Sequence, residues 1–197
     1  MRIKAVIFDL DGTLTEPILD FKQIRSEIGL PDGDLLAGIK AMNPLQRDRA
    51  AAILERHERY AVEHSTLNDG VPETLTTLRK RQISIGLLTR NTRENTLHVA
   101  RRHDLTFDAI VDRYDGPAKP DGAGVLNLCG QFGVVPSETL VVGDFLHDLQ
   151  SARNAGAIAV LMETHPDAEQ FKPYADYSIS HMSELVDLVG QLERVPT

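Results

Sequence analysis

The stretch VIFDLDGTL, from Val6 to Leu14, decides the fold of this chain. Its first residues are apolar and partly β-branched, so we predict a short buried strand over residues 3–8. The run ends in Asp9 and Asp11, and Gly12 behind them permits a sharp turn of the backbone. Because an unpaired carboxylate is too costly to leave in a core, a buried strand that ends in carboxylates indicates a site for chemistry.

The pattern changes directly after this strand. Residues 15–69 carry no strand signal, and their apolar spacing predicts three helices. The first covers residues 21–28, the second is expected to be capped by Asp32, and the third runs from an N-cap at Asn43 to about His64. We interpret this block as a small helical insertion after the first strand.

From residue 70 onward, predicted strands and helices alternate. The strands are expected over residues 83–88, 107–111, 140–142 and 157–162, and the helices over residues 72–82, 92–103, 124–132, 148–154 and 183–192. This alternation predicts an α/β fold, a Rossmann-like doubly wound parallel sheet covered by helices on both faces. The expected domains are a core of residues 1–14 and 70–197, and the insertion of residues 15–69.

Composition excludes several classes of partner. The formal net charge of the 197 residues is -8, which disfavours nucleic acid because phosphate backbones repel an acidic protein. No apolar run approaches the roughly 18 residues that a membrane span needs. Cys129 is the only cysteine, so neither an intrachain disulfide nor a cysteine metal cluster is possible. We expect a cytoplasmic protein, either a monomer or a homodimer.

Polar residues follow the predicted strands at their carboxyl ends, where ligands bind in open parallel sheets. Thr89 ends the second strand, Lys119 lies in the loop after the third, and Asp144 and Asp148 follow the strand at 140–142. With the two opening aspartates, four carboxylates would surround one point and repel one another, so we expect a Mg²⁺ ion among them. Such a site, with a lysine and a threonine hydroxyl, suits a phosphoryl dianion.

Four motifs in order, FDLDGT, a strand ending in Thr89, Lys119-Pro120 and VVGDFLHD, resemble the haloacid dehalogenase-like (HAD) superfamily of phosphohydrolases, in its helical-cap, phosphoglycolate phosphatase-like branch. The resemblance covers nearly the whole chain, and the insertion matches the family's helical cap. It implies that Asp9 attacks phosphorus to form an aspartyl-phosphate. It also implies that Asp11 protonates the leaving oxygen and then activates water.

The resemblance further implies a phosphate-binding set and a metal-binding set. Phosphate would be held by Thr89 and Lys119. Apart from the resemblance, Arg90 and Asn91 follow Thr89 in a polar loop and are further candidates for contact with substrate, the alternative being that they are only solvated. The Mg²⁺ ligands would be Asp9, Asp11 through its main-chain carbonyl, Asp144 and Asp148, the last either directly or in the outer shell.

The expected function is a Mg²⁺-dependent phosphatase acting on a small phosphorylated metabolite, with a phosphoglycolate-like substrate favoured. A phosphomutase of the same fold, similar to β-phosphoglucomutase, is the main alternative, and Thr13 favours hydrolysis over it. A 2-haloacid dehalogenase would need neither the metal nor Asp11. A non-enzymatic phospho-acceptor domain would carry its acidic pair after the first strand and its acceptor after the third, which is the reverse of the order here.

Overall fold

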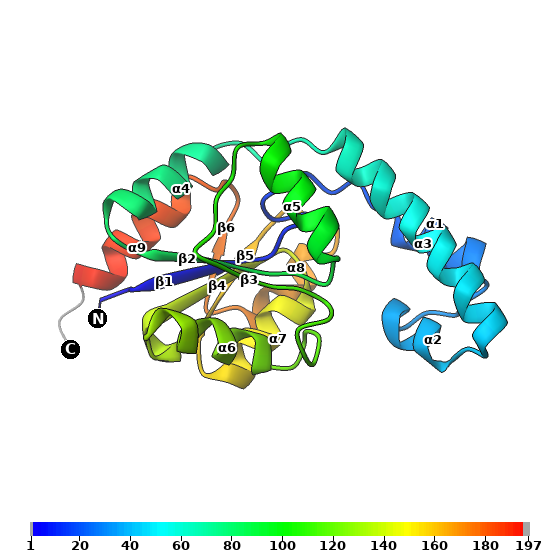
Figure 1. Cartoon of the computed structure of the whole chain (residues 1–197). Coiled ribbons are helices and arrows are strands. Elements are labelled where there is room, and N and C mark those ends of the chain that lie inside the picture. Colours follow the sequence, from blue (N-terminus) through cyan, green and yellow to red (C-terminus); the bar gives the residue numbers. More distant parts are fainter. Residues whose placement is uncertain (1, 195–197) are drawn as a thin grey trace. The chain divides into compact units, whose positions relative to one another are not determined.

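The computed structural model describes residues 2–194 of the chain (Figure 1). Ile18–Ser65 forms one compact unit, and the residues before and after it form the other. The strands are β1 (Ala5–Phe8), β2 (Ser84–Leu88), β3 (Ala109–Val111), β4 (Thr139–Gly143), β5 (Ile158–Met162) and β6 (Tyr177–Ile179). The helices are α1 (Phe21–Ile28), α2 (Leu35–Ala41), α3 (Pro44–His64), α4 (Val71–Lys80), α5 (Arg93–Arg102), α6 (Ala123–Phe132), α7 (Leu146–Ala155), α8 (Ala168–Phe171) and α9 (Glu184–Arg194), with 3₁₀ turns at Pro136–Glu138 and Lys172–Tyr174.

The larger unit is built on one six-stranded sheet of order β3-β2-β1-β4-β5-β6, in which every neighbouring pair is parallel. β1 lies at the centre, and Phe8 at its end is level with Leu87 of β2 and Val142 of β4. The main-chain N–H of Asp9 continues this register, since it donates to Val142 O at 2.9 Å. The residues that follow these three strands therefore emerge at one edge of the sheet. The predicted α/β, Rossmann-like fold is confirmed.

Helices cover both faces of this sheet, with α4, α5 and α9 on one side and α6 and α7 on the other (Figure 1). All four residues of β1 are buried, as expected for a strand packed on two sides. On the α6 and α7 side, the core cluster includes Ile7, Leu88, Val125, Leu128, Val141, Leu149 and Leu161. Burial of this apolar cluster stabilises the strand ends from which the polar residues project.

The smaller unit contains the three helices that the sequence predicts, α1, α2 and α3. They share a separate apolar cluster of Ile24, Leu35, Ile39, Ala50 and Leu54. The predicted N-cap of the third helix is correct, because Asn43 Oδ1 accepts from Gln46 N at 3.0 Å.

The predicted N-cap of the second helix at Asp32 is wrong. Asp34 holds this position, and its Oδ1 accepts from Ala37 N at 2.8 Å. Gly33, between the two aspartates, has φ of 131°, so the chain is not yet helical there and the cap falls to the later residue.

Two kinds of feature went unpredicted. The helix α8 spans four residues and the 3₁₀ turns three each, which is too short for an apolar repeat to reveal them. The helix predicted from Asp148 begins two residues earlier, at Leu146.

Within residues 2–194, no helix combines the length and apolar character that crossing a bilayer would need.

Candidate active site

Lys119 contacts β2, the residue that follows β1, and helix α7. Its Nζ donates to Asp9 Oδ1 after β1 and to Asp148 Oδ1 in α7, each at 2.5 Å, and to the carbonyl oxygen of Leu88 in β2 at 3.0 Å. The residue is only 5% exposed. Both carboxylates raise the pKa of this lysine and outweigh burial, which alone would lower it, so the ammonium stays charged.

Three of the four predicted carboxylates lie together. Oxygens of Asp9, Asp144 and Asp148 fall within 4.8 Å of one another. Burial raises the pKa of Asp9 to about 7, with Lys119 opposing the rise and Asp148 adding to it. Burial, together with the carboxylates of Asp148 and Asp9, raises the pKa of Asp144 well above its usual range, while the hydrogen bond from Thr13 and the charge of Lys119 oppose the rise.

Crowded carboxylates with raised pKa values bind either protons or a cation. A set made only of oxygens fits a hard divalent ion such as Mg²⁺. The carboxylate of Asp11 is not in this cluster of the described residues, and the predicted role of its main-chain carbonyl stays a prediction.

Small residues and hydrogen bonds hold the two later aspartates in place. Thr13 Oγ1 donates to Asp144 Oδ1 at 3.1 Å, and Phe145 N donates to Asp148 Oδ2 at 3.1 Å. Gly12 has φ of 86°, and a Cβ built there would lie 2.3 Å from Asp144 Oδ2. The turn after β1 therefore needs glycine both for its backbone conformation and for space beside the carboxylate.

Asp11 has separate surroundings. Its Oδ2 accepts a hydrogen bond from Asn91 Nδ2 at 3.1 Å. Burial raises the pKa of Asp11, while the Asn91 hydrogen bond, Lys119 and Arg113 act in the opposite direction. Among the described residues, this carboxylate lies outside the group that could hold a cation and is bound by an amide donor instead, an arrangement that suits proton transfer. The structure thus separates the two carboxylates of the opening stretch by their contacts.

Three of the four predicted phosphate-binding residues, Thr89, Arg90 and Asn91, lie in one loop after β2, and the fourth, Lys119, follows β3. Thr89 and Asn91 are each 3% exposed, and Thr89 Oγ1 accepts from Asn91 N at 3.0 Å. Arg90 Nη1 lies 2.8 Å from Nδ1 of His147, in the first turn of α7. The contact of these side chains with substrate phosphate stays a prediction.

Two residues that support the opening stretch were not predicted. Asn68 Nδ2 donates to the carbonyl oxygens of Thr13 at 2.8 Å and Thr15 at 3.1 Å. Thr164 Oγ1 donates to the carbonyl oxygen of Gly12 at 2.5 Å. No sequence pattern marks them, because their partners lie more than 50 residues away along the chain.

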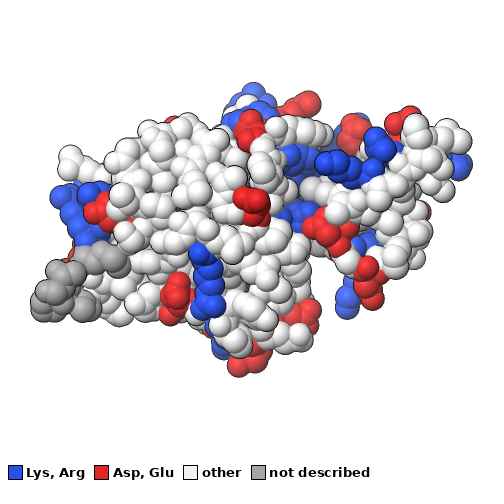
Figure 2. Space-filling model, turned by 90° about the horizontal axis from the view of Figure 1, so that it is seen from below, with Lys and Arg blue, Asp and Glu red and all other residues white. Residues whose placement is uncertain are grey.

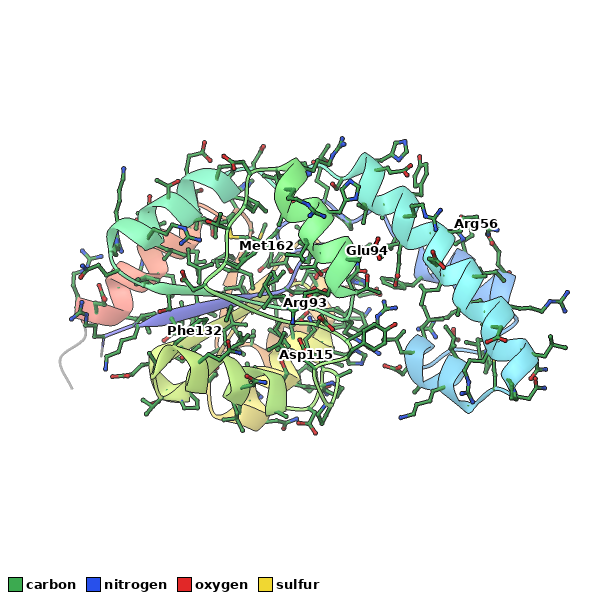
Figure 3. All side chains as sticks on the ribbon, viewed as in Figure 1. Arg56, Arg93, Glu94, Asp115, Phe132 and Met162 are labelled. Atoms are coloured by element: carbon green, nitrogen blue, oxygen red, sulfur yellow. The ribbon has the colours of Figure 1, made fainter. Side chains whose placement is uncertain are left out.

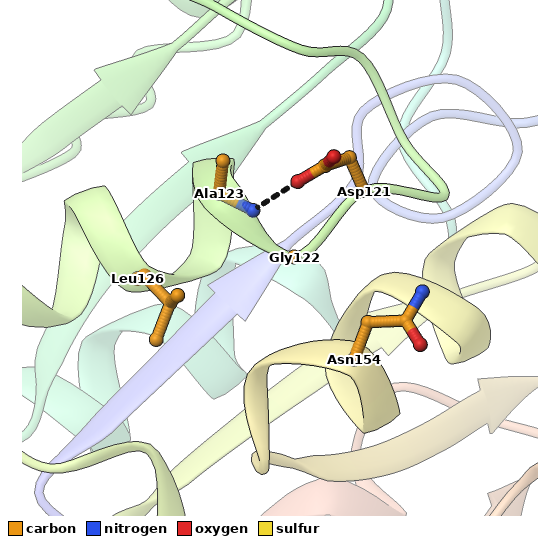
Figure 4. Close-up of a pocket in the computed structure, with 5 residues that line it drawn as sticks. All are labelled: Asp121, Gly122, Ala123, Leu126 and Asn154. Atoms are coloured by element: carbon orange, nitrogen blue, oxygen red, sulfur yellow. Dashed lines mark hydrogen bonds between the residues drawn. The ribbon is translucent and has the colours of Figure 1, made fainter.

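On the face shown in Figure 2, acidic and basic side chains are interspersed among uncharged ones. A separate shallow pocket at the start of α6 is lined by Asp121, Gly122, Ala123, Leu126 and Asn154 (Figure 4). Its one carboxylate accepts from the main-chain N–H of Ala123 at 2.8 Å, so Asp121 supports the helix start. None of the predicted site residues lines this pocket.

Comparison with known proteins agrees with this geometry. The family model described as "Haloacid dehalogenase-like hydrolase" matches residues 16–162. N-acetylmuramic acid 6-phosphate phosphatase of Pseudomonas aeruginosa is 29% identical, over 97% of this chain and 96% of the relative. Phosphoglycolate phosphatase of Chromobacterium violaceum is also 29% identical, over 95% and 97% respectively.

The fold is shared with solved structures as well. The crystal structure of a hydrolase from Pseudomonas syringae superimposes with a TM-score of 0.81 at 21% identity, covering 98% of this chain and all of the other. The prediction of a phosphatase is confirmed by the full-length relatives. The chain therefore belongs to the haloacid dehalogenase-like hydrolase family.

Proposed function

We propose that this phosphatase hydrolyses a small phosphorylated metabolite through an aspartyl-phosphate on Asp9, with Mg²⁺ as cofactor. The observation that carries the proposal is the contact of Lys119 with both Asp9 and Asp148 inside a cluster of three carboxylates. One buried cation and a site for a second make this the most favourable place for a phosphoryl dianion.

The roles follow from the contacts. Asp9 supplies the attacking oxygen, and Lys119 holds this carboxylate and draws the negative phosphoryl group toward it. The Thr89 hydroxyl donates to a phosphoryl oxygen. Asp11 protonates the leaving oxygen as its bond to phosphorus breaks, and then takes a proton from the attacking water.

Asp9, Asp144 and Asp148 would hold the Mg²⁺, together with the main-chain carbonyl of Asp11. Bound there, Mg²⁺ would neutralise charge that develops on the phosphoryl oxygens. The carboxylates serve this purpose only when they are deprotonated, and the contact with Lys119 favours that state for Asp9.

The substrate is proposed from the relatives. The named activities of two full-length relatives are the hydrolysis of a sugar 6-phosphate and of phosphoglycolate. We propose that residues 15–69 act as a cap that selects among such small phosphomonoesters, and we favour a phosphoglycolate-like substrate. A cytoplasmic location and a monomeric or homodimeric state remain predictions.

The test is phosphate release from p-nitrophenyl phosphate, followed by a screen that includes phosphoglycolate and sugar phosphates. Wild type should turn over with Mg²⁺ and not with EDTA. Asp9→Asn should be inactive, whereas Asp187→Asn, at an exposed position in α9, should match wild type. Asp11→Asn should accumulate enzyme that carries the phosphoryl group on Asp9, because hydrolysis of this aspartyl-phosphate lacks the carboxylate that takes a proton from water.

Two results would overturn the proposal. Full turnover by Asp9→Asn would exclude the aspartyl-phosphate. Isomerisation of a hexose phosphate without net phosphate release would identify a phosphomutase instead.

A further inference from the structure

A chain of hydrogen bonds leads from the loop after β3 to the carboxylate of Asp11. Asn91 donates its amide N–H to Asp11 Oδ2 at 3.1 Å, although it lies 80 residues away in sequence. The oxygen of the Asn91 side chain already accepts from Thr92 N at 2.8 Å and from Asn95 Nδ2 at 2.9 Å. The side-chain NH₂ group is therefore the part of Asn91 that faces Asp11. The orientation of Asn91 is therefore set by its own helix start.

Arg113 holds the backbone that carries this asparagine. Its Nε donates to the carbonyl oxygen of Arg90 at 2.6 Å, and its main-chain N–H donates to the carbonyl oxygen of Asn91 at 3.2 Å. Two consecutive carbonyl groups of the loop after β2 are thus fixed by one residue of the loop after β3.

The loop that carries Arg113 is itself anchored. Arg93, in the first turn of α5, pairs with Asp112 at 2.7 Å and also with Asp115. Figure 3 shows Arg93 and Asp115 meeting beside the start of α5. Asp112 is buried and also accepts from Tyr114 N at 2.8 Å. The loop around Arg113 therefore has little freedom to shift.

We propose that Asn91 and Arg113 are positioning residues for the proton transfer to the leaving group. Asn91 binds Oδ2 of Asp11, so Oδ1 is the oxygen that carries the transferred proton. Arg113 keeps Asn91 at that distance. This inference rests on the proposed phosphatase mechanism, and it assigns to Asn91 a contact with the acid in addition to any contact with phosphate.

The mechanism makes a specific demand on leaving groups. When the leaving oxygen is a strong base, it must receive its proton as the bond to phosphorus breaks. When it leaves as a weakly basic anion, the proton matters little. Phenyl phosphate and p-nitrophenyl phosphate form a matched pair, because the phenol has a pKa of about 10, like that of tyrosine, and the nitro group makes its anion much less basic.

The experiment compares kcat/KM for these two substrates with Mg²⁺ present, because kcat/KM reports the steps up to departure of the leaving group. A hydrogen bond to a charged group corresponds to roughly tenfold or more in rate. Asn91→Ala should therefore lower kcat/KM for phenyl phosphate about tenfold more than for p-nitrophenyl phosphate. Arg113→Ala should do the same to a smaller extent.

Two further variants separate positioning from general damage. Asn91→Leu keeps a similar side-chain size without adding a charge and loses the donor to Asp11, so it should show the same selective loss as Asn91→Ala. Asn127→Ala, on the exposed side of α6, should change neither substrate. Melting temperatures check that each variant is folded.

Equal losses on both substrates for Asn91→Ala and Asn91→Leu would refute the inference and leave the phosphatase mechanism standing. A wild type that releases phosphate from neither substrate would overturn both.

Discussion

Replacing Lys119 by methionine tests the electrostatics of the site directly. The substitution keeps the length and apolar stem of the side chain but removes the ammonium that lies 2.5 Å from Asp9 and from Asp148. Three crowded carboxylates then remain with no cation among them. Removing one partner from a buried ion pair typically costs about 3–5 kcal/mol. For a chain of this size, that corresponds to a fall in Tm of roughly 10 °C.

The loss should depend on pH. Lys119 opposes the rise in the pKa of Asp9, which stands at about 7, so the pKa of Asp9 increases further in the variant. A folded-state pKa above the unfolded value means that the folded protein binds the extra proton below that pKa and loses it above. In the variant Asp9 keeps its proton at pH 8, where the unfolded chain and most of the wild type have lost theirs, so the stability of the variant falls over the whole range from pH 6 to pH 8 and that of the wild type only up to about pH 7. Lys119→Met should therefore be more destabilised at pH 8 than at pH 6.

The assay is urea unfolding in EDTA, repeated with MgCl₂. The matched control is Lys4→Met, which removes an exposed lysine paired with Glu138 at 2.8 Å. Such a surface pair contributes at most about 1 kcal/mol. Mg²⁺ should restore part of the stability of Lys119→Met and leave the effect of Lys4→Met unchanged. If both variants lose equally in EDTA, the reasoning about a buried, charged lysine is wrong.

Three other results are expected. Mg²⁺ should raise the Tm of wild type more at pH 8 than at pH 5.5, because below the Asp9 pKa of about 7 the ion must displace a proton. An equal rise in Tm at both pH values would argue against binding at Asp9. Gly12→Ala should lower the free energy of unfolding by about 1–3 kcal/mol and reduce turnover more than tenfold, because the new Cβ would clash with Asp144. The control is Gly130→Ala, which has open space for a Cβ and should reduce neither quantity. Asp34→Ala should lower stability by about 1 kcal/mol in thermal melts and Asp32→Ala should not, because only Asp34 caps α2.

Much of the fold is visible in local patterns. The apolar run before Asp9 and the alternation after residue 70 predict the parallel sheet, and the structure confirms it. The helix of four residues, α8, left no signal because it is shorter than two apolar repeats. The sequence pattern also could not show whether Asp32 or Asp34 caps α2, because this depends on the backbone conformation at Gly33.

The stretch from Val6 to Leu14 shows which features the local sequence determines and which depend on tertiary structure. The sequence by itself determined that Val6–Phe8 form a buried strand and that two carboxylates follow it, because burial and turn preferences are local properties of the chain. Only the tertiary structure decided that Asp9 pairs with Lys119 while Asp11 accepts from Asn91. Those partners lie 110 and 80 residues away, and strand register and the clearance at Gly12 bring them within hydrogen-bond distance.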